Sequence, residues 1–259
     1  TTQDFHQIIN PIASLGCVLW LLGDCRNQLL SIGDTWHGAD LARDLTDTWM
    51  LRAAVGSKTL LLTEGRRAEP ELFAWISSMT PGGARDSLAV ALPAARLAFP
   101  ARGRPAASNV CLCHRTRMRV IKAAQAQRLR RDRPAAYLTL EGEKPLGQRL
   151  YIYAGVPLIA CVQATRDGVH NSMLLTVTGF DGETVSLKDR EGDAEFRLSH
   201  AWVAKHTRSG LCYTISSAQG RTIFGELGIF DTDHPRWSLR HLYTALSRAT
   251  AAALLSIES

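Results

Sequence analysis

Two short stretches near the end of the chain carry side chains suited to binding phosphate. The first, residues 212–223, is a short apolar run that leads into Gln219 and Gly220. The second, residues 241–250, has the pattern of a helix and presents one arginine, Arg248, among small residues. A guanidinium group holds phosphate oxygens at two points and stays charged at physiological pH. These residues could therefore bind a phosphate, or the charge that develops when a phosphoryl group is transferred.

The bulk composition describes a globular chain without a membrane span. The 259 residues are 46% hydrophobic, which is enough for a core and predicts one large domain or two smaller ones. No apolar run reaches the ~18 residues of a transmembrane helix, so no membrane partner is expected. The net charge of +6 is compatible with a polyanionic partner. The start lacks both a methionine and the basic region of a signal peptide, which favours a fragment or a processed chain.

The six cysteines do not form a metal-binding pattern. None belongs to a C-x-x-C pair, and Cys111, Cys113 and His114 are too closely spaced for a zinc site. We expect buried, reduced thiols and no metal ligands in this chain. Reduced thiols indicate an intracellular protein, cytoplasmic or nuclear, and a viral source is compatible with the same features.

The first candidate residues follow a strand near the start of the chain. Residues 17–22 form an apolar run that predicts a buried parallel strand, and Gly23 and Asp24 follow it directly. Gln28 comes next in the loop, with Asn27 as the alternative for the same role.

A second strand is predicted at residues 60–63, and two arginines follow it. Arg67 is the candidate, and Arg66 is the alternative. Pro70, followed by acidic residues, is typical of the first turn of a helix.

The middle of the chain alternates between loop and phosphate-binding patterns. Residues 80–108 are rich in Pro and Gly, which predicts a loop that joins two domains. Residues 110–113 predict a strand, and the helix after it begins near Thr116 and Arg117, where unpaired N–H groups suit a phosphate. The arginine-rich run 128–133 is either a solvated face or a sequence-independent phosphate patch.

Residues 138–207 have a different character. Short apolar runs alternate with Asp-Gly and Glu-Gly turns, which predicts a small β-barrel. The expected strands are residues 150–153, 158–162, 174–177 and 184–187.

These motifs together resemble those of superfamily 1 DNA helicases, closest to the RecD-like and Pif-like 5′-to-3′ branch. Residues 212–223, C-Y-T-I-S-S-A-Q-G-R-T-I, are similar to the fifth helicase motif, and residues 241–250, H-L-Y-T-A-L-S-R-A-T, to the sixth. Gly23, Asp24 and Gln28 are similar to the third motif, G-D-x-x-Q-L, with one extra residue. In the fifth motif, Ser216 stands where the family has a histidine that contacts the strand.

The resemblance implies an α/β fold, the P-loop NTPase (RecA-like) helicase core. Residues 1–100 would form part of the first RecA-like domain. Residues 101–137 and 208–259 would form a complete second domain. Residues 138–207 would be a small SH3-like β-barrel insertion that lies over the single strand.

The resemblance also implies a role for each candidate residue. The catalytic groups would be Arg248 and Arg67, which meet charge on the γ-phosphate, together with Gln28. The nucleotide-binding groups would be Gly23, Asp24, Gln219 and Gly220. The nucleic-acid contacts would be Thr116, Arg117, Thr214 and Ser216.

The chain lacks part of the machinery that such a helicase needs. It has no G-x-x-x-x-G-K-[ST] sequence and no Asp-Glu pair ahead of residue 18. We therefore expect the ATP cradle and the Mg²⁺ ligands upstream, in cis or on another chain, and no ATPase activity from this chain alone. The expected partner is single-stranded DNA, with RNA as an alternative, in replication or repair. The alternative function is a non-catalytic nucleic-acid-binding or assembly subunit with a helicase-like fold.

Overall fold

The computed structural model describes residues 7–8, 11–12, 14–16, 24, 27–29, 35–36, 39–40, 60, 64–142 and 148–258. The chain forms two compact units. The first comprises Thr1–Phe99, Ala218–Phe224 and Pro235–Leu254. The second comprises Pro100–Ser217, Gly225–His234 and Leu255–Ser259. The first unit thus groups the segment 235–254 with residues 64–99, whereas the division into two RecA-like domains and an insertion stays a prediction.

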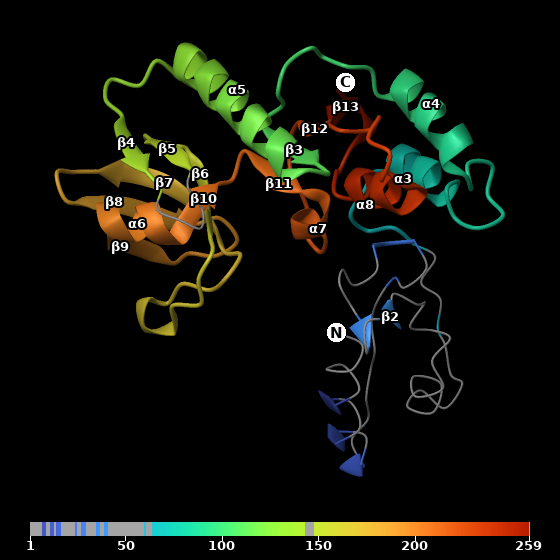
Figure 1. Cartoon of the computed structure of the whole chain (residues 1–259), viewed down its shortest axis with the longest axis horizontal. Coiled ribbons are helices and arrows are strands. Elements are labelled where there is room, and N and C mark those ends of the chain that lie inside the picture. Colours follow the sequence, from blue (N-terminus) through green and yellow to red (C-terminus); the bar gives the residue numbers. More distant parts are fainter. Residues whose placement is uncertain are drawn as a thin grey trace. The chain divides into compact units, whose positions relative to one another are not determined.

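A four-stranded parallel sheet forms the centre of the second unit. Its strands, in the order β11-β3-β12-β13, are Cys212–Thr214, Ser108–Cys111, Leu227–Ile229 and Leu255–Ile257 (Figure 1). Every residue of β3, β12 and β13 is buried, as expected for parallel strands that are covered on both faces. The strand predicted at residues 110–113 and the apolar run that opens residues 212–223 are thus confirmed as strands of this sheet.

Helix α5, His114–Asp132, packs against β3 and β11. Val120, Ile121 and Ala124 lie on its buried face, whereas its opposite face is exposed. The helix ends at Arg133, whose φ of 40° places that residue in the left-handed region that stops a helix. The predicted strand-then-helix order after residue 110 is therefore confirmed.

Antiparallel strands form the rest of the second unit. Strand β4, Leu138–Glu141, pairs with β5, Arg149–Ile152. A five-stranded sheet has the order β10-β6-β7-β8-β9, with bounds Thr207–Ser209, Pro157–Ala160, Leu174–Phe180, Thr184–Asp189 and Glu195–Ser199. The short helices η2, Thr165–Asp167, and α6, His200–His206, complete it. All four predicted strands are present, and the SH3-like identity of the segment stays a prediction.

The described part of the first unit is mainly helical. Its helices are α3, Pro70–Ser77, α4, Leu88–Ala98, α8, Leu239–Leu246, and the short η3, Ala252–Leu254. Helix α7, Ile215–Ala218, spans the boundary between the units. A two-residue pair, β1 Thr35–Trp36 with β2 Ala39–Asp40, is also described.

Helix α4 lies within residues 80–108, which the sequence predicted to be a loop-rich join, and it corrects that prediction for Leu88–Ala98. The sequence of α4, LAVALPAARLA, consists largely of strong helix formers, and Pro93 lies inside the helix. Its buried Ala91 and Ala95 are one turn apart, and the helix contacts α8. Packing of this small-residue face offsets the hydrogen bond that proline removes. Within the described residues, no helix has the length and apolar character to cross a bilayer.

Asn109 fixes the start of strand β3. Its side chain accepts a hydrogen bond from Ala106 N (2.9 Å) and donates to Ala106 O (3.0 Å) and Leu211 O (2.9 Å). Asn109 is fully buried, so water cannot replace its side chain as the partner of these backbone groups. Asn109 therefore holds β3 to the residue before β11 as well as to its own loop.

Replacing Asn109 tests how strongly this contact holds the parallel sheet. Asn109→Ala leaves three buried backbone groups without this partner, so the free energy of unfolding should fall by about 2–3 kcal/mol. Urea unfolding followed by circular dichroism measures the change. The control is Asn171→Ala, at an exposed turn position, which should change the midpoint little. Equal midpoints for the two variants would contradict the role of Asn109.

Candidate functional site

The segment before α3 is tied to the residues that follow α8. Glu69 N donates to Thr250 O at 2.9 Å, and Glu69 Oε1 accepts from Ala252 N at 2.6 Å. Arg67 Nη1 donates to Ser247 O at 3.3 Å. These bonds place Arg67 at the carboxyl end of α8, one residue from Arg248. Arg66 is instead exposed and forms an ion pair with Glu64 at 2.8 Å, so Arg67 is the arginine that reaches the site.

Arg248 is buried, and its guanidinium group is fully engaged with neutral oxygens. The residue is 1% exposed. Nε donates to Thr244 O (3.0 Å), Nη1 to Arg221 O (3.2 Å) and Nη2 to Ser247 Oγ (2.7 Å). Burial, with a smaller contribution from the positive charge of Arg67, lowers the pKa of Arg248 to about 10. Arg248 therefore remains a cation at neutral pH, although burial removes the water that would solvate its charge.

The predicted residues Gln28 and Gln219 lie in contact with each other. Gln219 Nε2 donates to Gln28 Oε1 (3.4 Å) and to Leu29 O (3.2 Å), across about 190 positions of sequence. Arg240 Nη1 also donates to Gln28 O, at 3.4 Å. Gly220 has a φ of +85°, which a side chain would strain, and this turn leaves Gln219 exposed.

Asn27, the alternative to Gln28, has a different partner. Its N and Nδ2 atoms donate to Asp24 Oδ1 at 3.0 and 3.1 Å. Gln28 is therefore the residue that meets Gln219. Gly23 lies outside the described residues.

Tyr243 belongs to the same site and was not predicted. Burial, followed by the nearby negative charge of Asp24 and a hydrogen bond to it, raises the pKa of Tyr243 to about 12. Its position in the sixth motif was the only signal in the sequence. Tyr243 connects the predicted Asp24 to α8, the helix that leads to Arg248.

Thr116 lies at the start of α5, and its hydroxyl group is hydrogen-bonded to a carboxylate of the same chain. Thr116 Oγ1 donates to Asp231 Oδ1 at 2.6 Å. Asp231 Oδ2 accepts from Leu112 N (3.2 Å) and Cys113 N (2.9 Å), at the end of β3. These are the groups that the sequence assigned to a phosphate, and here Asp231 supplies the negative charge. Asp231 has a φ of 67°, and no local sequence signal identified it.

Arg117 is buried and lacks an ion-pair partner among the described residues. It is 8% exposed, and its Nε and Nη1 atoms have no hydrogen-bond partner there. Burial, together with the positive charge of Arg208, lowers the pKa of Arg117. An anion that reached Arg117 would satisfy donors that the described part of the chain leaves unsatisfied.

Thr214 and Ser216 lie where β11 gives way to α7. Thr214 Oγ1 donates to Ser217 Oγ at 3.0 Å, which fixes the turn. Ser216 is exposed. The structure thus separates the predicted residues into two groups: Arg67, Gln28, Asp24, Gln219, Gly220 and Arg248 in the first unit, and Thr116, Arg117, Thr214 and Ser216 in the second.

Four residues of the first group carry hydrogen-bond donors that suit a phosphate. Gln28, Arg67, Gln219 and Arg248, together named the Gln–Arg set, offer amide and guanidinium N–H groups. Within the described residues, no group of three or more His, Cys, Asp or Glu side chains could hold a metal ion. The N–H groups of this set could donate to the oxygens of a phosphate.

The described residues form a mixed α/β fold with a parallel sheet and candidate residues at strand and helix ends. Among solved structures, it is similar to Pif1 helicases. A Bacteroides Pif1 helicase in complex with ADP-AlF3 and single-stranded DNA aligns with a TM-score of 0.50 and 16% identity, over 77% of this chain and 51% of that one. At this identity the likeness shows a shared fold, an α/β architecture with a parallel sheet.

Two further Pif1 structures are similar. Bacteroides Pif1 bound to single-stranded DNA gives a TM-score of 0.49 and 14% identity, over 76% of this chain and 50% of that one. The Candida albicans Pif1 helicase gives 0.49 and 13%, over 73% and 53%. This chain therefore spans about half the length of these structures. No family model and no curated protein matches it.

The raised pKa of Tyr243 makes stability depend on pH. The phenol ionises near pH 10 in the unfolded chain and near 12 in the folded one, so the unfolded state binds fewer protons between these values. Stability should fall as the pH rises through this window. In Tyr243→Phe it should fall less steeply, by up to one proton per unfolding event.

Urea unfolding at several pH values between 9 and about 11.5 measures this slope. The control is Tyr137→Phe, since that tyrosine is 53% exposed. It should keep the wild-type slope. If Tyr243→Phe also keeps it, Tyr243 is not the buried phenol described here.

Proposed function

We propose that this chain forms part of an ATP-dependent DNA helicase that moves along single-stranded DNA and unwinds duplex. In this proposal the Gln–Arg set contacts the γ-phosphate of ATP. The phosphate cradle and the Mg²⁺ ligands come from residues outside this chain, in cis or on a second chain. Residues 138–207 form the barrel insertion of the predicted second RecA-like domain.

The contact between Gln28 and Gln219 is the observation that carries the proposal. Each residue was assigned to the γ-phosphate from its own motif, and the two motifs are about 190 residues apart. Their side chains meet at 3.4 Å, and Arg248 donates to the carbonyl oxygen of Arg221, two residues after Gln219. Neither Arg67 nor Arg248 forms an ion pair with a described carboxylate. A polar pair that senses phosphate and a cation that meets developing charge are the groups that phosphoryl transfer needs.

Arg248 would take part only after its present hydrogen bonds exchange. Its three nitrogens donate to neutral oxygens, and each such bond is weaker than a bond to a charged phosphate oxygen. Arg67 is exposed and, among the described residues, forms one hydrogen bond, to Ser247 O. Arg67 would therefore contact the phosphate first. The buried Arg248 would add its positive charge behind Arg67.

A comparison of Arg67 with Arg66 tests the nucleotide role. In a protein that also supplies the phosphate cradle, Arg67→Ala should lower steady-state ATP turnover by about 10³-fold, the lower end of the range for arginine fingers. Arg67→Lys should restore little, because an ammonium group lacks the two-pronged fork.

Arg66→Ala is the matched control. This arginine is adjacent and exposed but pairs with Glu64, so turnover should stay within about threefold of wild type. Turnover with saturating single-stranded DNA is the measurement. Similar losses in the two alanine variants, or none in either, would remove the Gln–Arg set from the reaction.

Arg117 provides a test of strand binding. A cation kept for packing stabilises the fold, whereas one kept for a phosphate costs stability until the phosphate binds. Arg117→Met keeps the volume and removes the buried charge, so it should raise the thermal midpoint while weakening single-strand binding at least about fivefold.

Differential scanning fluorimetry and fluorescence anisotropy with a labelled single strand measure the two effects. Arg166→Met, at an exposed position in η2, is the control and should change neither. A lower midpoint with unchanged affinity would show that Arg117 is structural.

A further inference from the structure

Helix α5 holds the entire positive excess of the chain. Seven of the 30 Lys and Arg residues lie in α5, but only one of the 24 Asp and Glu residues does. Its formal charge is therefore +6, equal to that of the whole chain, and the other 240 residues balance at 23 charges of each sign. The basic character of this protein is thus a local property of one helix.

Four of these cations form a straight, exposed stripe along α5. The α5 stripe consists of Arg115, Arg119, Lys122 and Arg130, all exposed. At 3.6 residues per turn they lie within a sector about 80° wide, and they extend over about 22 Å of helix. The stripe lies opposite the face that Val120, Ile121 and Ala124 bury against the sheet.

The α5 stripe has no acidic partner within the described part of the chain. None of its four side chains forms a hydrogen bond or ion pair there. Arg115 and Arg119 are four residues apart, and Arg119 and Lys122 are three apart, spacings at which like charges repel. A helix face that is merely solvated usually alternates charges of opposite sign. This stripe therefore works against the folding of its own helix unless an anion covers it.

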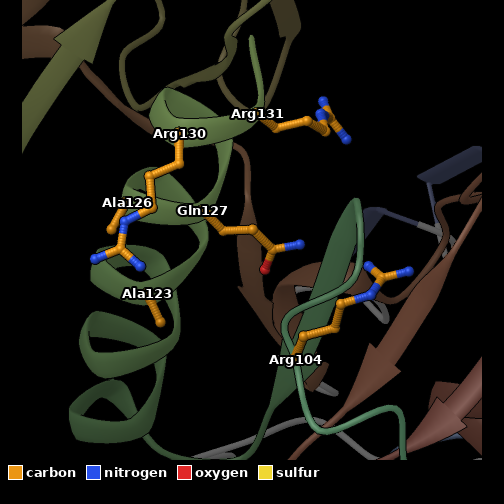
Figure 2. Close-up of a pocket in the computed structure, with 6 residues that line it drawn as sticks. All are labelled: Arg104, Ala123, Ala126, Gln127, Arg130 and Arg131. Atoms are coloured by element: carbon orange, nitrogen blue, oxygen red, sulfur yellow. The ribbon is translucent and has the colours of Figure 1, made fainter. Parts of the chain in front are cut away.

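A shallow cavity of about 670 Å³ adjoins the carboxyl half of the stripe. Ala123, Ala126, Gln127, Arg130 and Arg131 line it from α5, and Arg104 lines it from the loop before β3. In Figure 2, Gln127 and Arg131 extend from the helix toward the side on which Arg104 lies. The small alanines leave open space, and the long basic side chains surround it.

The acidic groups near this cavity are already engaged. Glu226 accepts both Nη atoms of Arg104, at 3.1 Å each, and pairs with Arg102 at 2.8 Å. Asp132 pairs with Arg131 at 2.6 Å. The Arg104 hydrogen bond lowers the pKa of Glu226, and the Arg131 hydrogen bond lowers that of Asp132. Arg130 is left to meet an external anion.

We infer that the α5 stripe and the adjoining cavity bind the phosphate backbone of duplex DNA. A rigid row of cations neutralises phosphates without reading sequence. Sites for single strands combine such cations with aromatic side chains that stack on bases, and α5 contains no Phe, Tyr or Trp. A duplex stacks its own bases and presents the denser charge. This contact goes beyond the single-strand binding proposed above and does not depend on it.

Neutralising the stripe tests the inference. The variant Arg119→Gln/Lys122→Gln/Arg130→Gln keeps good helix formers at exposed positions, so circular dichroism should be unchanged. Its affinity for a blunt, labelled duplex of about 20 base pairs at ~0.1 M salt should fall at least about tenfold. The slope of log K against log salt should fall by about 2.7, or 0.9 for each lost contact. Its affinity for a single strand of the same length should change less than about threefold, because the proposed strand contacts, Thr116 and Arg117 among them, are kept in this variant.

The control variant is Arg166→Gln/Lys188→Gln/Lys205→Gln, which removes the same charge from exposed positions in the antiparallel region. It should leave duplex affinity unchanged. The inference is overturned if the two variants bind duplex equally, if duplex and single-strand affinity fall together, or if the wild type does not bind duplex. A wild type that binds duplex through the stripe but no single strand would support this inference and contradict the proposed function.

Discussion

The parallel pairing of β3 with β11 and β12 is the contact on which the second unit depends. Asn109 in β3 bonds Leu211, 102 residues further along the chain, so the whole antiparallel region lies inside one closed loop. Closing a long loop costs entropy that grows slowly with its length, and the complete burial of β3 offsets this cost. The pairing also brings the carboxyl ends of β3 and β11 to one edge of the sheet, where ligands of α/β proteins bind. Thr116 and Thr214 reach that edge for this reason.

Two buried arginines carry a cost that the core does not explain. Arg117 and Arg248 are almost completely buried, and neither forms an ion pair with a described carboxylate. Their pKa values are lowered chiefly by burial, which shows that the charged form is disfavoured where it stands. A leucine or methionine would fill the same volume without this penalty. Cations that a fold retains against its own stability are candidates for binding an anion.

The positive charge of the chain is concentrated on one helix, α5. One face of α5 buries Val120, Ile121 and Ala124 together with Arg117, and the other presents the exposed cations of the α5 stripe. The same helix therefore connects the stability of the parallel sheet to any polyanion that binds its exposed face. At its start, the carboxylate of Asp231 accepts hydrogen bonds from Thr116 and from the end of β3. A phosphate would have to displace or approach that carboxylate, so Asp231 limits how tightly an anion is held there.

The sequence by itself determined the features that depend on neighbours in the chain. Apolar runs predicted β3 and β11, the Asp-Gly and Glu-Gly turns predicted the antiparallel strands, and short motifs selected Gln28, Gln219 and Arg248. The helix α4 was missed because its proline is tolerated only through packing against α8. Only the tertiary structure decided that Gln28 rather than Asn27 meets Gln219, that Arg67 rather than Arg66 reaches the site, and that Arg248 is buried. Each of these outcomes depends on contacts between segments far apart in sequence, and local periodicity carries no information about such contacts.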